Sequence, residues 1–117
     1  MAQQIDFNNL RQAVEGRDVD RMLELYADDA ELEIVNKDNP PGSRRRFHGK
    51  EQIRQYYEDV FSRDMTHRVE DEVVGENRVA FHDNCQYPDG TRVMGARSME
   101  LRDGKIQREL DIEVWDE

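Results

Sequence analysis

The second half of the chain constrains the fold most, because it alternates apolar and polar residues in short segments that turn sequences separate. The turns are expected at 75–77, 88–90 and 103–104, where a glycine stands next to an acidic residue. Alternation with a period of two is typical of a strand that buries only one face. Residues 65–115 therefore predict a four-stranded meander whose apolar face must be covered by another layer of the domain.

Amphipathic helices in the first half of the chain can provide that layer. Asp6 and Asp18 are suitable N-cap residues, and apolar side chains recur at helical spacing in the segments 7–14 and 19–26 that follow them. A broader apolar face over 53–61 predicts a third helix, which must pack on the sheet.

One short strand and one loop complete the predicted order of elements. Residues 31–35 alternate acidic and apolar side chains, as a half-buried strand does. Residues 37–49 contain two prolines and the run Arg44-Arg45-Arg46, and we expect them to form a solvated loop. The chain is therefore predicted to be one α+β domain over residues 1–117, with the order α-α-β-α-β-β-β-β.

Charge and cysteine content disfavour several partners and locations. The 117 residues include 27 acidic and 17 basic side chains, a formal net charge of −10, which opposes binding to nucleic acid or to an anionic membrane surface. No apolar stretch approaches the roughly 20 residues of a membrane-spanning helix. Cys85 is the only cysteine, and the chain opens Met-Ala-Gln-Gln-Ile-Asp without the basic and apolar parts of a signal peptide. We therefore expect a cytoplasmic protein without an internal disulfide.

Three motifs resemble those of a known superfamily. They are Tyr-Ala-Asp-Asp-Ala at 26–30, Phe-His-Gly-Lys-Glu-Gln-Ile at 47–53 followed by Tyr56-Tyr57, and Asp-Gly-Lys-Ile at 103–106. In this order and spacing they resemble the nuclear transport factor 2-like superfamily, in particular its branch of SnoaL-like polyketide cyclases and ketosteroid-isomerase-like proteins. The resemblance spans residues 5–115 and implies a cone-shaped, cystatin-like α+β roll. In that fold three helices pack on a curved antiparallel sheet and close over a pocket that needs no cofactor.

The resemblance also allows two catalytic sets of the superfamily to be tested. The general base, tyrosine donor and protonated aspartate of ketosteroid isomerases would fall on Ile34, Leu10 and Arg97, none of which can do that chemistry. The Arg-x-Asp pair of the epoxide-hydrolase branch would fall within 79–85, which is Val-Ala-Phe-His-Asp-Asn-Cys. We therefore expect neither a ketosteroid isomerase nor an epoxide hydrolase.

One aspartate does match a catalytic position of the polyketide-cyclase branch. Asp111 corresponds to its strand aspartate, although the His-Trp that precedes it there is replaced by Glu109-Leu110. The resemblance places the odd-numbered residues of the last strand in the pocket, where Arg97 of the preceding strand would face them. Asp111 oriented by Arg97 is the candidate catalytic pair, and the same two residues could equally form a structural ion pair.

Further pocket residues follow from the same assignment of strand faces. Asp83 is a second candidate inward carboxylate, and it could instead lie at the rim of the pocket with its oxygens satisfied by backbone donors. The candidate ligand-binding residues are Tyr57, Phe81, Asp83, Met99, Glu109, Glu113 and Trp115.

Two functions are compatible with these residues. The favoured one is a domain that binds a small organic molecule with polar and apolar parts, without catalysis. The alternative is a cofactor-independent isomerase, cyclase or lyase in which Asp111, positioned by Arg97, is the general base. A metal site is not expected, because the sequence has no histidine pair at metal-ligand spacing and Cys85 has no cysteine partner. His48 and His67 are expected to take no part.

The even-numbered residues of the last strand predict an apolar surface on the back of the sheet. With the neighbouring strand they give the set Met94, Ala96, Leu110, Ile112 and Val114. Monomeric proteins rarely expose such a surface. We therefore expect a back-to-back homodimer, and the alternative is a monomer in which this face turns inward.

Overall fold

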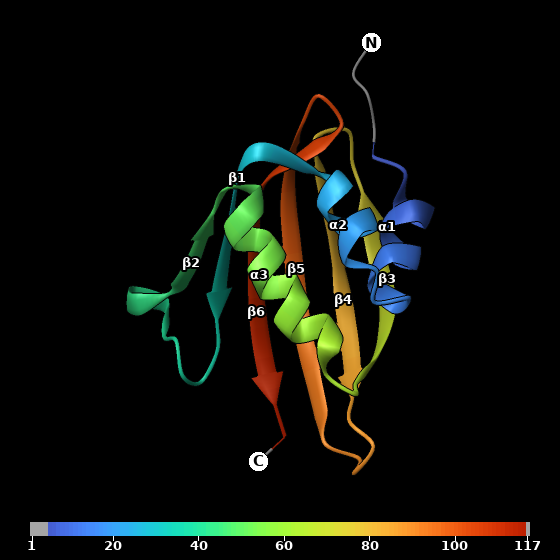
Figure 1. Cartoon of the computed structure of the whole chain (residues 1–117), viewed down its shortest axis with the longest axis vertical. Helices are drawn as coiled ribbons and strands as arrows, with labels where there is room; N and C mark the ends of the chain where they lie inside the picture. The colour runs from blue at the N-terminus through green and yellow to red at the C-terminus, as the bar shows by residue number, and fades with distance from the viewer. Residues whose placement is uncertain (1–4, 117) are drawn as a thin grey trace.

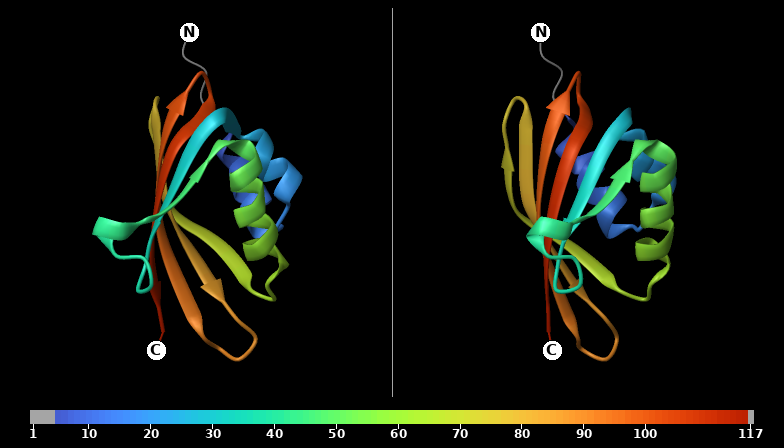
Figure 2. Two further views of the ribbon diagram at one scale, coloured as in Figure 1. Left: turned by 60° about the vertical axis from the view of Figure 1, so that its left-hand side comes forward. Right: turned by 90° about the vertical axis from the view of Figure 1, so that its left-hand side faces the viewer.

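Three helices lie on one face of a curved sheet of six strands (Figures 1 and 2). The computed structural model describes residues 5–116, so the two ends of the domain predicted over residues 1–117 lie outside the described residues. The helices are α1 (Phe7–Glu15), α2 (Val19–Glu24) and α3 (Gly49–Ser62), with a 3-10 turn at Pro41–Ser43. The strands are β1 (Tyr26–Val35), β2 (Arg45–His48), β3 (Thr66–Val74), β4 (Arg78–Gln86), β5 (Arg92–Arg102) and β6 (Lys105–Trp115).

The helices begin where the sequence predicts. The side chains of Asp6 and Asp18 accept hydrogen bonds from backbone N–H groups in the first turns of α1 and α2, at 3.2 and 3.1 Å. Helix α3 buries its apolar face mainly against β1, while α1 packs on β3. None of the helices within the described residues is long and apolar enough to cross a bilayer.

The sheet is mixed, which corrects the predicted antiparallel topology. Its strands lie in the order β2-β1-β6-β5-β4-β3. Strands β3 to β6 form the predicted meander, but β1 runs parallel to β6, with Ile34 opposite Asp111. Parallel neighbours need a long crossover connection, here the segment from β2 through β5. No local turn sequence marks such a pair, so the local pattern could not predict its direction.

Strand β2 lies within the predicted loop and is a second correction. It pairs antiparallel with β1, with Arg45 opposite Ile34 and Phe47 opposite Leu32. It forms one edge of the sheet (Figure 2). Its arginines are exposed, and only Phe47 packs against the core. A short edge strand of this kind has no apolar alternation, so its sequence resembles that of a loop.

The inward faces of the last three strands of the meander follow the period of two, with one exception. In β4 and β5 the odd-numbered residues are buried, as predicted. A shift of register between Glu100 and Leu101 moves Ile106 from the predicted back face into the core, where it is fully buried. Further along β6 the predicted alternation holds, with Asp111 inside and Ile112 outside.

Candidate functional site

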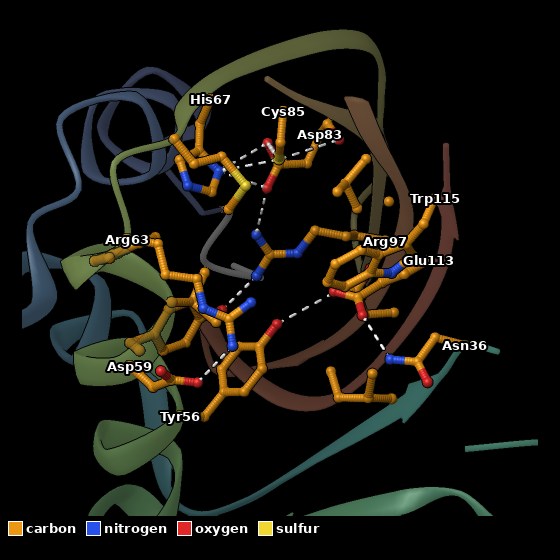
Figure 3. Close-up of a pocket in the computed structure, with 18 of the residues that line it drawn as sticks. Asn36, Tyr56, Asp59, Arg63, His67, Asp83, Cys85, Arg97, Glu113 and Trp115 are labelled. Atoms are coloured by element: carbon orange, nitrogen blue, oxygen red, sulfur yellow. Dashed lines mark hydrogen bonds and ion pairs between the residues drawn. The ribbon is translucent and has the colours of Figure 1, made fainter. Parts of the chain in front are cut away.

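A cavity of about 180 Å³ lies between the C-terminal half of α3 and the inner face of strands β4 to β6 (Figure 3). The predicted site residues that line it are Tyr57, Asp83, Arg97, Asp111, Glu113 and Trp115. Phe81, Met99 and Glu109 do not line it and are buried behind its wall. The structure therefore brings most of the predicted residues to one cavity and assigns the other three to the core.

The strand register determines which side chains reach the cavity. On β5 and β6, Gly95 lies opposite Glu113, and Arg97 lies opposite Asp111. Gly95 leaves room for its neighbour, because a Cβ atom at that position would lie only 2.8 Å from Oδ1 of Asp111. The carboxyl group of Asp111 thus occupies space that any larger residue at position 95 would take.

Arg97 has other partners than the sequence predicts. Its Nε donates to Glu109 at 2.7 Å, its Nη1 lies 3.4 Å from Asp83, and its Nη2 donates to the hydroxyl of Tyr57. Within residues 5–116, no hydrogen bond or ion pair joins Arg97 to Asp111. A long side chain on a strand reaches diagonal as well as direct neighbours, which lets Arg97 bypass Asp111 and pair with the deeper Glu109.

Two tyrosines complete the network around Glu109. The hydroxyl of Tyr26 donates to Glu109, and it lies 2.6 Å from the hydroxyl of Tyr57. Burial raises the pKa of both tyrosines, so their hydroxyls stay protonated and can donate hydrogen bonds. Tyr26 is not among the predicted site residues, because its helical spacing after Asp18 placed it at the end of the second helix.

Asp111 is the carboxyl group that this network leaves out. It is buried, and its contact with the hydroxyl of Tyr56 is long, at 3.5 Å. Burial raises the pKa of Asp111 well above its usual range; Arg97 opposes this shift, and the charges of Glu113 and Glu109 add to it. Asp111 is therefore a carboxyl group that binds a proton more readily than an exposed aspartate does.

Three buried polar atoms at the cavity have no hydrogen-bond partner among the described residues. They are Nε2 of His67, Oδ1 of Asp111 and Nε1 of Trp115. Buried polar groups in folded proteins are nearly always satisfied. Three residues that line the cavity thus carry unused hydrogen-bonding capacity.

The wall formed by β3 and β4 differs most from the prediction. His67, expected to take no part, is buried, and its Nδ1 lies 3.2 Å from both carboxylate oxygens of Asp83. Asp83 is 6% exposed, which excludes the rim position. Although its own burial opposes ionisation, the hydrogen bond from His67 and the charge of Arg97 lower the pKa of Asp83. Cys85 adjoins both residues, with Sγ 3.3 Å from each.

The sequence of this chain matches a protein family over most of its length. Residues 7–109 match the family described as SnoaL-like domain. This chain belongs to the SnoaL-like domain family. The family named by the resemblance is thereby confirmed, whereas no functionally curated protein matches the sequence.

Solved structures share the fold of this SnoaL-like domain. An NTF2-like protein of unknown function from Mesorhizobium loti superposes with a TM-score of 0.80 at 18% identity, over 92% of this chain and 87% of that chain. A protein named as a candidate ketosteroid isomerase, from Kribbella flavida, superposes with a TM-score of 0.76 at 22% identity, over 95% of this chain and 75% of that chain. A candidate polyketide cyclase from Sinorhizobium meliloti superposes with a TM-score of 0.68 at 19% identity, over 90% of this chain and 91% of that chain. At these identities the likeness extends to the fold alone.

The first prediction concerns the cost of burying Asp111. Because its pKa is raised in the folded state, the wild-type domain loses stability as the pH rises from about 4 through the folded-state pKa of Asp111. Asp111→Asn removes this loss, and it should raise the free energy of unfolding at pH 7 by about 0.5–2 kcal/mol.

Urea unfolding at several pH values measures this difference. The stability advantage of Asp111→Asn should shrink as the pH falls toward about 4. At that pH Asp111 is protonated in the folded wild type and, like the asparagine of the variant, carries no charge. Glu76→Gln, at an exposed carboxylate in the β3–β4 turn, is the matched control and should show no such trend. An Asp111→Asn variant less stable than the wild type at pH 7 would contradict the assigned environment.

Proposed function

We propose that the cavity of this SnoaL-like domain binds a small uncharged organic molecule that carries a hydrogen-bonding oxygen, such as a ketone or hydroxyketone. The observation that supports this most directly is the set of unpartnered buried atoms on His67, Asp111 and Trp115. Leaving one buried polar group unsatisfied costs about 1–3 kcal/mol. A ligand with polar atoms opposite these groups recovers that cost.

The size and charge of the cavity narrow the class of ligand. A volume of about 180 Å³ lies below the usual range for drug-sized ligands, which favours a small compound. Asp83, Glu109 and Asp111 are buried around one guanidinium, that of Arg97, so an anionic ligand would be repelled.

Trp115 offers a direct test of binding. It is the only tryptophan of the chain and it lines the cavity, so its fluorescence reports on the site. Titration with cyclohexanone and with 2-hydroxycyclohexanone should give a saturable change in that fluorescence. Asp111→Ala should weaken binding about tenfold, which is the worth of one hydrogen bond.

Glu76→Ala is the control for this titration, because it removes a carboxylate from an exposed turn. It should leave the dissociation constant unchanged. A fluorescence change that does not saturate, or one that Asp111→Ala leaves intact, would count against binding in this cavity.

Acid–base catalysis is the second candidate function. In an isomerase, cyclase or lyase of this type, Asp111 would remove a proton next to the carbonyl group of the ligand. Two observations favour it: Oδ1 is free, and the raised pKa of Asp111 brings proton exchange closer to neutral pH. Arg97 would act as a positioning residue for Glu109 and Tyr57, since no hydrogen bond or ion pair joins it to Asp111 within residues 5–116.

Hydrogen–deuterium exchange separates catalysis from binding. NMR of 2-hydroxycyclohexanone in D₂O should show loss of the protons next to the carbonyl group faster with the wild-type protein than in buffer. Asp111→Asn should slow the protein-dependent exchange at least about 100-fold, the usual contribution of a general base. Saturable binding without any exchange would leave a binding protein and exclude the catalytic role.

We further propose that the domain forms a homodimer through the back of the sheet. Figure 2 shows that no helix covers this face. The predicted interface residues lie there, with Val114 68% exposed and Met94 and Ile112 each 43% exposed. Ala96 is exposed and Leu110 half-buried. A second copy would remove these apolar side chains from water, which stabilises the dimer by roughly 25 cal/mol for each Å² of apolar surface buried.

Val114→Lys should shift the protein toward the monomer, because it places a charge in the apolar contact. Sedimentation velocity over a range of protein concentrations measures the change. Gln55→Lys is the control, since it adds the same charge at an exposed position of α3, on the other side of the sheet. A wild-type protein that stays monomeric at the highest concentration would refute the dimer.

A further inference from the structure

A triangle of polar side chains lies at one end of the cavity, where β3 and β4 form its wall (Figure 3). His67 on β3 is the direct cross-strand partner of Cys85 on β4. Asp83 precedes Cys85 by two residues, so it lies on the same face of β4. All three side chains are buried and line the cavity. Two hydrogen-bonded strands therefore hold a nitrogen, an oxygen and a sulfur atom in a rigid frame.

The distances within this triangle match those of a metal site. Nδ1 of His67 lies 3.2 Å from Oδ1 of Asp83 and 3.3 Å from Sγ of Cys85, and Sγ lies 3.3 Å from the same Oδ1. Zinc bonds of about 2.0–2.3 Å in a tetrahedron separate neighbouring ligand atoms by about 3.3–3.6 Å. The three atoms thus form one face of such a tetrahedron, and each separation need change by only a few tenths of an ångström.

We propose that His67, Asp83 and Cys85 bind one transition-metal dication of the Zn²⁺ type through Nδ1, Oδ1 and Sγ. A mixed set of nitrogen, oxygen and sulfur ligands suits Zn²⁺ and related ions, whereas Mg²⁺ and Ca²⁺ prefer oxygen ligands alone. Three protein ligands leave a fourth position, which faces the cavity and takes a water molecule or an oxygen of a bound compound. The site does not depend on the proposed organic ligand.

The charges around the triangle accommodate a cation. The buried carboxylates of Asp83, Glu109 and Asp111 outnumber the one buried guanidinium, that of Arg97. Of the carboxylates, Glu109 lies closest to Arg97, at 2.7 Å, and the 3.4 Å contact of Arg97 with Asp83 uses Oδ2. Nδ1 of His67 lies 3.2 Å from both oxygens of Asp83, and Oδ1 is the one that also contacts Cys85, at 3.3 Å. A dication at Oδ1 would therefore offset negative charge without displacing the guanidinium.

Cobalt titration tests the proposal directly. The full chain, dialysed against a chelator and then against metal-free buffer, is titrated with Co²⁺ alone. Binding at this site should produce a thiolate-to-cobalt charge-transfer absorption that saturates at one ion per chain, and Zn²⁺ should abolish it by displacement. Since Cys85 is the only cysteine, the band reports on this triangle.

Variants locate the ion and control for surface binding. Cys85→Ser should eliminate the band, and His67→Gln should weaken Co²⁺ binding by at least about 100-fold, because even changes outside the ligand set cost 10–100-fold. His82→Gln is the matched control: His82 and Asp71 form an exposed pair between the same two strands, at 2.9 Å. It should leave the titration unchanged.

Two outcomes would overturn the proposal. One is wild-type protein that develops no charge-transfer band at any Co²⁺ concentration, which would make the triangle a set of hydrogen bonds only. The other is binding that survives in both Cys85→Ser and His67→Gln and disappears in His82→Gln. The wild-type spectrum decides the first outcome even if a variant fails to fold.

Discussion

The rest of the interior depends on the hydrogen bonds and ion pairs of one buried group, the guanidinium of Arg97. It joins Glu109 of β6, Asp83 of β4 and Tyr57 of α3, and through Tyr57 it reaches Tyr26 of β1. A buried charge is tolerated only when it is paired and hydrogen-bonded, and removing one partner of such a pair costs about 3–5 kcal/mol. Arg97 thus links the helical layer to three strands at one point. The cavity lies beside this point, because Arg97 and Tyr57 are part of its lining.

The unequal sharing of Arg97 also explains the chemistry of the cavity. Of the carboxylates, Glu109 receives the shortest contact and is paired inside the wall, while Asp83 receives a longer one through Oδ2 and contacts Cys85 through Oδ1. Asp111 receives none, and burial then raises its pKa. The chemical reactivity of the cavity therefore arises because its buried carboxyl groups outnumber its buried cation.

Local patterns predicted much of this arrangement before any tertiary contact was known. The period of two correctly placed Asp83 and Arg97 on the inward faces of their strands, the resemblance correctly placed Asp111 there, and the motifs correctly indicated the SnoaL-like domain family. Errors occurred where structure depends on distant pairing. Strand β2 packs only Phe47 against the core, and a β-bulge turned Ile106 inward, so neither leaves a periodic trace in the sequence.

The sequence by itself determined the order of most elements, the caps of the first two helices and which residues can face a cavity, because these depend on neighbours a few positions apart. Only the tertiary structure decided which groups meet. The diagonal reach of Arg97 to Glu109, the parallel pairing of β1 with β6 and the cross-strand meeting of His67 with Cys85 join residues far apart in the chain. Such pairs carry no local spacing rule, since the register between strands is set by the whole sheet and its packing.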